Sequence, residues 1–235
     1  MRIAVFGGTF DPFTESHKAI VDELLAGNVA DLVLIAPTVV NYHRTGYEPW
    51  LTDDERIKVI EGFFDVFYKG RVAVCTDDID AKRTLATEQL RAEFAANRRY
   101  IDTLTGIIGS YGSGNTYLTV IGSDSLERFK TWHRWRDILG MSSLVVVQGR
   151  GGKDVESDIA FSQIRIPPQL GFGSATAVRE KYRGRSYMEY LVARAPGYGF
   201  DANDAIRTIK HSWIDWARQF GGGTKWVVEI GRAHV

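Results

Sequence analysis

The loop GGTFDPFTESH, residues 7–17, carries the residue types that point most clearly to chemistry. It follows an apolar run at residues 3–6 and leads into a helical pattern that begins near His17. Glycines let a ligand approach the backbone closely, and the start of a helix offers free N–H groups with a partial positive charge. The pattern indicates an anion-binding loop, although a tight strand-to-helix turn with a capping histidine fits it equally well.

Two other glycine-rich segments do not fit a nucleotide site. GSYGSGN, residues 109–115, precedes a strand pattern, whereas the glycine fingerprint of dinucleotide-binding proteins follows a strand. GRGGK, residues 149–153, is followed by Asp154, where a P-loop has Ser or Thr. We interpret the first segment as a linker, and the second argues against P-loop phosphate binding.

The sequence lacks the signals of several other kinds of catalytic site. It has no convincing paired carboxylates, no G-x-S-x-G motif and no H-E-x-x-H spacing. The five histidines are scattered: His17, His43, His133, His211 and His234. Cys75 is the only cysteine, which excludes a disulfide framework and a multi-cysteine metal site, and we expect it to be a buried small hydrophobe.

Composition narrows the class of protein further. Lys plus Arg and Asp plus Glu each number 29, so the net charge is zero, which disfavours binding to nucleic-acid backbones. No apolar run approaches the roughly 20 residues of a membrane span. We therefore expect a cytoplasmic, soluble protein that binds neither nucleic acid nor membrane, and the sequence leaves open a homo-oligomer.

Strand and helix patterns alternate along most of the chain. Apolar runs at residues 3–6, 32–36, 72–76, 116–122 and 142–148 read as buried strands. Between them lie helical patterns at 17–25, after a Thr52 cap, at 81–108 and at 125–139. This alternation predicts an α/β fold with a doubly wound parallel sheet.

After Ile164 the pattern changes to a short strand, a glycine-containing turn and a helix that opens at Ser174. Apolar and aromatic residues at helical spacing predict one more helix at 201–220. We expect one domain at residues 1–200 and a C-terminal helix and tail at 201–235. The last seven residues, EIGRAHV, read like a translated sequencing adapter, and we interpret them as an artefact.

Three segments resemble, in order, the motifs of the nucleotidylyltransferase superfamily. Residues 7–17 are similar to its first signature, G-x-F-D/N-P-x-H/T-x-x-H. The segment IGSDSLERF, residues 121–129, followed by Trp132 and Trp135, resembles the G-x-D segment of nicotinate and nicotinamide mononucleotide adenylyltransferases. SATAVR, residues 174–179, is similar to the closing S-x-T-x-x-R motif.

This resemblance implies a Rossmann-like fold and transfer of AMP from ATP to a pyridine mononucleotide, with release of pyrophosphate, in NAD biosynthesis. Mg²⁺ would arrive with ATP, and the chain itself would supply no metal site. The implied catalytic residues are His17, Thr14 and Arg179. The implied ATP-binding residues are Gly7, Gly8, Phe10, Gly122, Asp124, Ser174 and Thr176. Those implied for the mononucleotide are Thr9, His43, Arg44 and Trp132.

The first motif departs from its histidine form at two positions. Thr14 stands where that form has its first histidine, and Ser16 replaces a frequent glycine. Threonine at this position also occurs in the family, among phosphopantetheine adenylyltransferases and some mononucleotide adenylyltransferases. The alternatives are therefore another nucleotidylyl transfer, to phosphopantetheine or from CTP, and a catalytically silent nucleotide sensor.

Several of the implied residues also have ordinary structural interpretations. Asp124 fits the N-cap of a helix that begins near Ser125. Trp132 fits a core position, since aromatics at helical spacing are usually buried. His43 and Arg44 fit a solvated loop, and Arg179 fits an exposed helix face.

Overall fold

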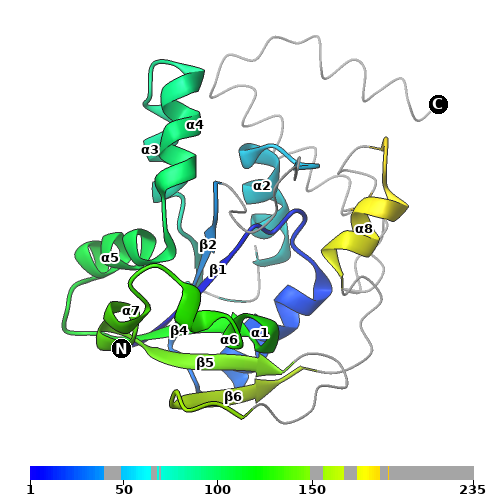
Figure 1. The fold of residues 1–235 in the computed structure, drawn as a ribbon. Coiled ribbons are helices and arrows are strands. Elements are labelled where there is room, and N and C mark those ends of the chain that lie inside the picture. The colour runs from blue at the N-terminus through cyan, green and yellow to red at the C-terminus, as the bar shows by residue number, and fades with distance from the viewer. Residues whose placement is uncertain are drawn as a thin grey trace. The chain divides into compact units, whose positions relative to one another are not determined.

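The computed structural model describes residues 1–39, 49–64, 68, 70–148, 156–166, 174–185 and 190. These residues form a six-stranded sheet of β1 (Arg2–Gly8), β2 (Leu32–Pro37), β3 (Val72–Val74), β4 (Thr116–Gly122), β5 (Ser143–Gln148) and β6 (Phe161–Arg165). The strand order is β3-β2-β1-β4-β5-β6, and every neighbouring pair is parallel (Figure 1). This doubly wound order confirms the predicted fold class.

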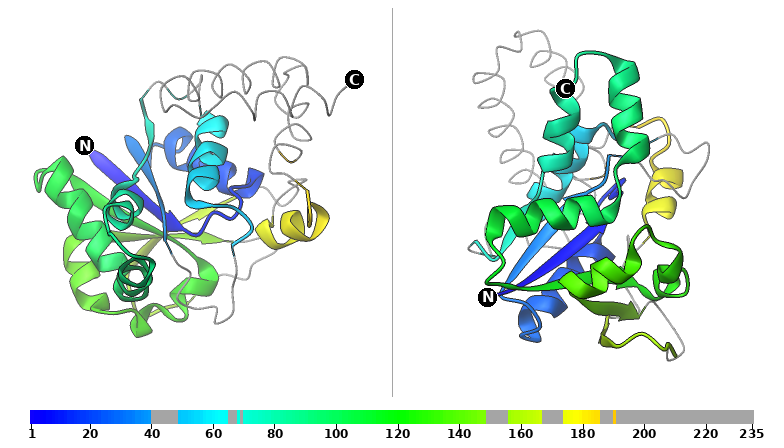
Figure 2. Two further views of the ribbon diagram at one scale, coloured as in Figure 1. Left: turned by 90° about the horizontal axis from the view of Figure 1, so that it is seen from above. Right: turned by 60° about the vertical axis from the view of Figure 1, so that its left-hand side comes forward.

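Helices cover both faces of the sheet. Ile3 and Val5 of β1 pack in one buried cluster with Leu104 of α5 (Tyr100–Tyr111) and Ile138 of α7 (Trp135–Met141). Side chains alternate along a strand, so Ala4 points to the opposite face. Figure 2 shows α1 (Glu15–Ala26) and α2 (Asp53–Phe64) on that face. The strands are thus buried on both sides, which is why they read as continuous apolar runs.

The helices that follow β1 and β2 both begin at threonine caps. Thr14 has extended backbone angles and is the N-cap of α1, which therefore starts two residues before the predicted position. Thr52 caps α2 as predicted: its Oγ1 accepts from the Glu55 N–H at 3.3 Å, and the Glu55 carboxylate accepts from the Thr52 N–H at 2.8 Å. This reciprocal arrangement is a capping box.

The helical pattern at residues 81–108 forms parts of three helices and not one continuous helix. These are α3 (Asp77–Arg83), α4 (Glu88–Asn97) and α5. Thr76 is the N-cap of α3, so β3 ends at Val74 and not at the predicted residue 76. Thr87 begins α4, where its Oγ1 accepts from the Leu90 N–H at 3.2 Å. A threonine that caps a helix start outweighs the helix-forming composition around it.

The helix expected at residues 125–139 is also divided. It forms α6 (Ser123–Leu126), a 3₁₀ turn η1 (Phe129–Thr131) and α7. The N-cap of α6 is Gly122, so the expectation that Asp124 caps a helix at Ser125 is wrong. Arg134 has a left-handed backbone, φ 55°, directly before α7. No glycine or proline marks these breaks, which follow from the packing of the aromatic residues.

The chain divides into two compact units, Met1–Lys181 and Tyr182–Val235. The last described helix of the first unit is α8 (Ala175–Lys181). The helix expected at 201–220 and the EIGRAHV tail lie outside the described residues, and the domain boundary at residue 200 stays a prediction. None of the helices in the described ranges has the length and hydropathy needed to cross a membrane.

Candidate functional site

The loops at the carboxyl ends of the strands surround a cavity of about 510 Å³. It lies where the strand order reverses, between β1 and β4, which is where doubly wound sheets bind ligands. Its wall includes Gly7 and Gly8 at the end of β1, Thr9 after β1, Thr38 after β2, and Gly122 at the end of β4. This volume is large enough for a mononucleotide-sized ligand.

Glycines at the end of β1 make room for two aromatic rings. A Cβ at Gly8 would lie 2.9 Å from the ring of Phe10, and one at Gly7 would lie 3.2 Å from Tyr100. Phe10 itself has a left-handed backbone with φ 48°. Larger residues at positions 7 and 8 would therefore displace the rings of Tyr100 and Phe10.

His17 is held as a neutral hydrogen-bond donor at the start of α1. Its Nδ1 accepts from the Thr14 backbone N–H at 2.9 Å, so in the neutral ring the proton is assigned to Nε2. The rings of Phe6, Phe10 and Phe13 surround it, with centroids 6.0, 5.2 and 5.1 Å from the imidazole. Burial among these rings lowers the pKa of His17 to about 4. At neutral pH the imidazole is uncharged and Nε2–H can donate to an anion.

Thr14 lies against the same imidazole. Its side chain is fully buried, and its Oγ1 is 3.1 Å from His17 Nδ1. The structure therefore brings together the two donors that the sequence singled out. A direct bond from Thr14 to a ligand stays a prediction.

Arg179 reaches the glycine loop from far along the chain. Its guanidinium donates to the backbone carbonyl of Asp11 and, at 3.1 Å, to Thr176 Oγ1. The Asp11 carboxylate is buried and accepts from the N–H groups of Trp50 and Leu51, both at 2.8 Å. The loop, the start of α2 and α8 are thus tied together through Asp11. The interpretation of Arg179 as an unattached residue on a helix face is wrong.

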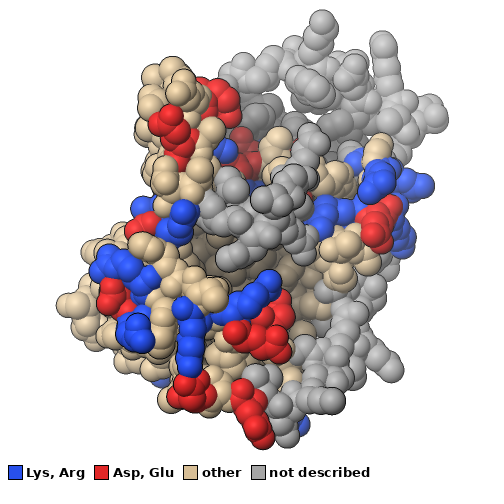
Figure 3. Space-filling view, in the orientation of Figure 1, with Lys and Arg blue, Asp and Glu red and all other residues tan. Residues whose placement is uncertain are grey.

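The other residues of the closing motif lie in the same place. Ser174 precedes α8, and its Oγ accepts from the Ala177 N–H at 3.4 Å. Figure 3 shows Lys and Arg over α8 with an acidic residue among them. The helix holds Arg179, Glu180 and Lys181, so its described residues sum to one positive charge.

Residues after β4 form the far wall of the cavity. Trp132 lines the cavity and also packs against the core, and its stacking on a pyridine ring stays a prediction. Its ring lies 5.4 Å from Tyr100 and 5.3 Å from Phe129, between centroids. Asp124 is exposed, 3.9 Å from Arg128, and a Cβ at Gly122 would lie 2.5 Å from its carboxylate. A side chain at position 122 would therefore move the Asp124 carboxylate from this position.

Charged and polar residues that the sequence did not single out complete the cavity. Asp78 is buried and accepts from Arg98, at 2.6 and 2.8 Å, and from Thr103 Oγ1 at 2.5 Å. Arg99 and Tyr100 line the same wall, at the start of α5. The run Arg98-Arg99 was a visible signal, but nothing in the sequence showed that it faces a cavity.

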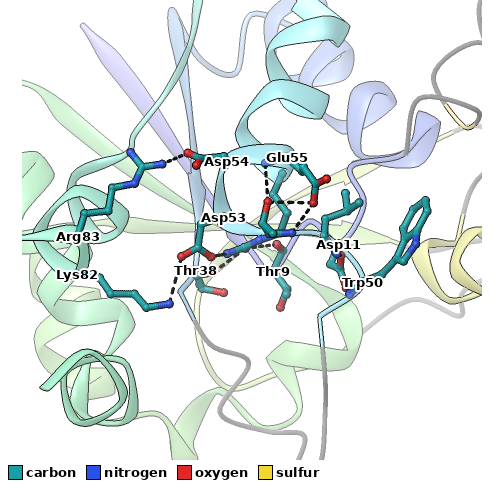
Figure 4. A network of polar contacts seen from close by, with 12 residues as sticks. Thr9, Asp11, Thr38, Trp50, Asp53, Asp54, Glu55, Lys82 and Arg83 are labelled. Carbon is teal, nitrogen blue, oxygen red and sulfur yellow. Dashed lines mark hydrogen bonds and ion pairs between the residues drawn. The ribbon is translucent and has the colours of Figure 1, made fainter. Parts of the chain in front are cut away.

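Arg56 of α2 is a second residue that the sequence did not reveal. It is buried, and it donates to the carbonyl oxygens of Thr9, at 2.6 Å, and Thr38, at 2.7 Å. It also pairs with Asp53 (Figure 4). His43 and Arg44, expected to bind the mononucleotide, lie outside the described residues.

Comparison with known proteins places this site in a family. The cytidylyltransferase-like family matches residues 5–181, which is most of the chain and contains all three motifs. A probable nicotinate-nucleotide adenylyltransferase of Fusobacterium nucleatum is 28% identical over 197 residues, covering 82% of this chain and 93% of that protein. Another probable nicotinate-nucleotide adenylyltransferase, of a Nitratiruptor species, is 28% identical over 181 residues, covering 72% and 90%.

Solved structures show the same fold. The Plasmodium falciparum nicotinic acid mononucleotide adenylyltransferase complexed with NaAD superposes with a TM-score of 0.56 at 16% identity. The comparison covers 80% of this chain and 87% of that one. The same enzyme complexed with APC gives a TM-score of 0.54, also at 16% identity, covering 77% and 83%.

Proposed function

The chain belongs to the cytidylyltransferase-like family, and from this premise we propose that it transfers AMP from ATP to nicotinate mononucleotide in NAD biosynthesis. The proposal rests on the position of one loop, residues 7–17, which connects a hydrogen-bond donor with the cavity. This loop ends at the neutral donor His17, and its first three residues, Gly7, Gly8 and Thr9, line the cavity. A reaction that joins two nucleotides needs a phosphate site and a mononucleotide site side by side.

The chemistry requires alignment more than acid–base catalysis. A phosphate oxygen of the mononucleotide attacks the α-phosphorus of ATP, a new P–O bond forms, and the bond to the bridging oxygen breaks. Pyrophosphate leaves with that electron pair. The attacking phosphate is already an anion near neutral pH, so no residue has to remove a proton. This agrees with a site whose histidine is neutral and whose buried carboxylates are already bonded.

We assign His17 and Arg179 to the phosphates of ATP. The Nε2–H of His17 donates to a non-bridging phosphate oxygen, and its charge does not change when the ligand arrives. Arg179 is already held at the glycine loop by Asp11 and Thr176, so little ordering is needed for it to contact phosphate. Thr14, Ser174 and the backbone at Gly7 and Gly8 complete this side.

Mg²⁺ would be held mainly by the triphosphate in this proposal. In the described part of the chain, no three His, Cys, Asp or Glu side chains are grouped as metal ligands. Asp11 lies within the loop, and both of its carboxylate oxygens already accept backbone N–H groups. When bound with ATP, the ion supplies positive charge to the leaving pyrophosphate.

The cavity favours the acid over the amide form of the mononucleotide. Among the described residues, three charged side chains line it, Asp78, Arg98 and Arg99, and their sum is one positive charge. The N-terminus of α5, which begins at Tyr100, adds a partial positive charge at the same wall. A pyridine ring stacked on Trp132 would place its carboxylate within this positive region, where a neutral carboxamide gains less.

The test is a substrate comparison with purified protein, ATP and Mg²⁺. We expect pyrophosphate and a dinucleotide with nicotinate mononucleotide, a slower reaction with nicotinamide mononucleotide, and none with phosphopantetheine. CTP in place of ATP should give no product. Calorimetric ATP binding without pyrophosphate release would instead identify a nucleotide sensor, and turnover with CTP or phosphopantetheine would identify another transferase. In this proposal the enzyme acts in the cytoplasm, where ATP is available.

A further inference from the structure

Arg56 is an unusual residue to find fully buried. It is the largest of the fully buried side chains among the described residues, with a relative exposure of 1%. Removing a guanidinium from water costs several kcal/mol, which its partners must offset. Its Nε has no hydrogen-bond partner in the described part of the protein, so even this arrangement is incomplete. An apolar side chain would fill the space without these costs, which suggests a role other than stability.

The partners of Arg56 are the backbones of two loops. One guanidinium nitrogen, NH1, donates to both the Thr9 carbonyl, at 2.6 Å, and the Thr38 carbonyl, at 2.7 Å. Thr9 follows β1 and Thr38 follows β2, and both residues line the cavity. A single atom therefore fixes the distance between two neighbouring parts of the cavity wall.

These contacts also fix the orientation of two peptide groups. In a planar trans peptide the C=O and N–H bonds point in opposite directions. Because the carbonyls of Thr9 and Thr38 point to Arg56, the N–H groups of Phe10 and Val39 point away from it. Phe10 is the ring that packs against His17, with centroids 5.2 Å apart, so the orientation reaches the phosphate side of the site.

Asp53 holds Arg56 in turn. One carboxylate oxygen pairs with Arg56 NH2, and the other accepts from Lys82 of α3 at 3.2 Å. Figure 4 shows Asp53 between Lys82 and the two loop residues Thr9 and Thr38. Arg83 and Asp54 form a parallel pair between the same two helices. The α2–α3 contact therefore limits the movement of the guanidinium.

We propose that Arg56 is a positioning residue for adenylyl transfer, which keeps the loops after β1 and β2 at the spacing that aligns the two substrates. It touches neither substrate and acts through Thr9 and Thr38. This inference rests on the proposed function only for its kinetic readout, since the two carbonyl contacts do not depend on the reaction.

The test compares Arg56→Lys with a matched control, Arg71→Lys. Arg71 also donates to backbone carbonyls, those of Leu25, Ala30 and Asp31. It directly precedes β3, however, at the amino end of that strand, whereas the cavity lies at the carboxyl ends of the strands. A lysine keeps the charge and loses the fork in both variants. Each variant is measured well below its melting temperature, with constants corrected for the folded fraction.

We expect Arg56→Lys to lower kcat/KM for the mononucleotide about 10²-fold, because small misplacements of reacting groups have effects of that size. Arg71→Lys should lower the melting temperature and leave kcat and both KM values within twofold of the wild type. Asp53→Asn provides a milder case, should Arg56→Lys not fold: it keeps an acceptor for Arg56 and should lower kcat/KM about tenfold. Kinetic constants within twofold of the wild type in the folded variants would overturn the proposal.

Hydrogen exchange separates this proposal from the proposed function. Arg56→Lys should raise amide exchange in peptides that cover residues 7–13 and 36–39 and not in β5, whereas a purely structural residue would raise exchange throughout. If the wild type makes no dinucleotide, the proposed function fails, and the exchange result alone decides. Local exchange then supports the positioning role, and global or unchanged exchange overturns it.

Discussion

The α1 side and the α5 side of the site differ in charge, since the first holds a neutral histidine and the second an ion pair. On the α1 side, His17 is surrounded by Phe6, Phe10 and Phe13 and is kept neutral. On the α5 side, Asp78 is buried but keeps a full ionic partner, Arg98. Both sides line or adjoin the same loop, so the contrast reflects different tasks. The neutral side can orient phosphates whose charge Mg²⁺ already offsets, whereas the charged side can select a ligand by its charge.

The largest expected effect comes from removing the neutral donor. His17→Ala should lower turnover by ~10²–10³-fold, the usual cost of losing one preorganised donor at a charged transition state. The fold should persist, because Phe6, Phe10 and Phe13 also pack against one another without the imidazole. Pyrophosphate release by the folded variant is the measurement. Near-normal turnover would remove His17 from the mechanism and end the contrast.

Removing a charge from the other side should affect stability first. Arg98→Met leaves Asp78 in the interior with Thr103 as its remaining hydrogen-bond partner among the described residues, and we expect a loss of about 3 kcal/mol in the free energy of unfolding. The matched control is Arg83→Met, which breaks exposed pairs with Asp54 and Asp80 and should cost at most about 1 kcal/mol. Urea unfolding of both variants measures the difference. Equal losses of unfolding free energy in the two variants would show that the Asp78–Arg98 pair contributes no more than an exposed ion pair.

In folded Arg98→Met, the preference for the acid over the amide mononucleotide should also fall. His17→Ala should slow both substrates alike, since the imidazole faces the phosphates in our assignment. The ratio of kcat/KM values for the two mononucleotides is the measurement. A change of that ratio in His17→Ala and not in Arg98→Met would reverse the roles of the two sides.

Thr14 tests the neutral side more finely. Its hydroxyl bonds either to a ligand or to the His17 ring, and in both cases Thr14→Val loses it while keeping nearly the same shape. We expect Thr14→Val to raise the activation free energy by about 1.5 kcal/mol, and Thr14→Ser to keep most activity. Equal turnover of the two variants, with a difference only in melting temperature, would leave Thr14 with a capping role alone.

A further effect should appear in the pH dependence of stability. Burial lowers the pKa of His17 to about 4, whereas an unfolded chain has an imidazole pKa near 6.5. Between these pKa values only the unfolded chain binds the proton. The contribution of His17 to the free energy of unfolding is therefore fully present above pH 6.5 and is lost as the pH falls toward 4. The expected contribution is about 1–3 kcal/mol. Urea midpoints at pH 7, 5.5 and 4.5 should fall more steeply for the wild type than for His17→Gln.

The sequence was a good guide to the strands and to the first loop. A strand buried on both faces must be apolar throughout, so β1, β2, β4 and β5 were visible as runs, within one or two residues of their ends. His17 and Thr14 were visible because residues 7–17 resemble the first motif of the superfamily and lie at a strand-to-helix turn. Their contact with each other follows from local structure alone, since residues three positions apart at a helix start are always close.

The α5 side and Arg56 could not be predicted in the same way. Asp78 and Arg98 are twenty residues apart in a segment that reads as surface helix, and only the folding of α3 and α5 makes them partners. Arg56 lies among acidic residues at a helix start, where an arginine is normally solvated. The breaks near residues 98 and 134 have no glycine or proline and depend on packing.

The bond between Arg179 and the Asp11 carbonyl joins residues 168 positions apart. Contacts of such separation form late in folding, because the intervening chain must first be ordered. During synthesis β1 and its loop are made first. Arg179, which bonds to that loop, is made almost last among residues 5–181, the region that matches the family. A partly synthesised chain can therefore complete β1 to β5 and still lack a closed phosphate site, so premature termination should yield folded protein without activity.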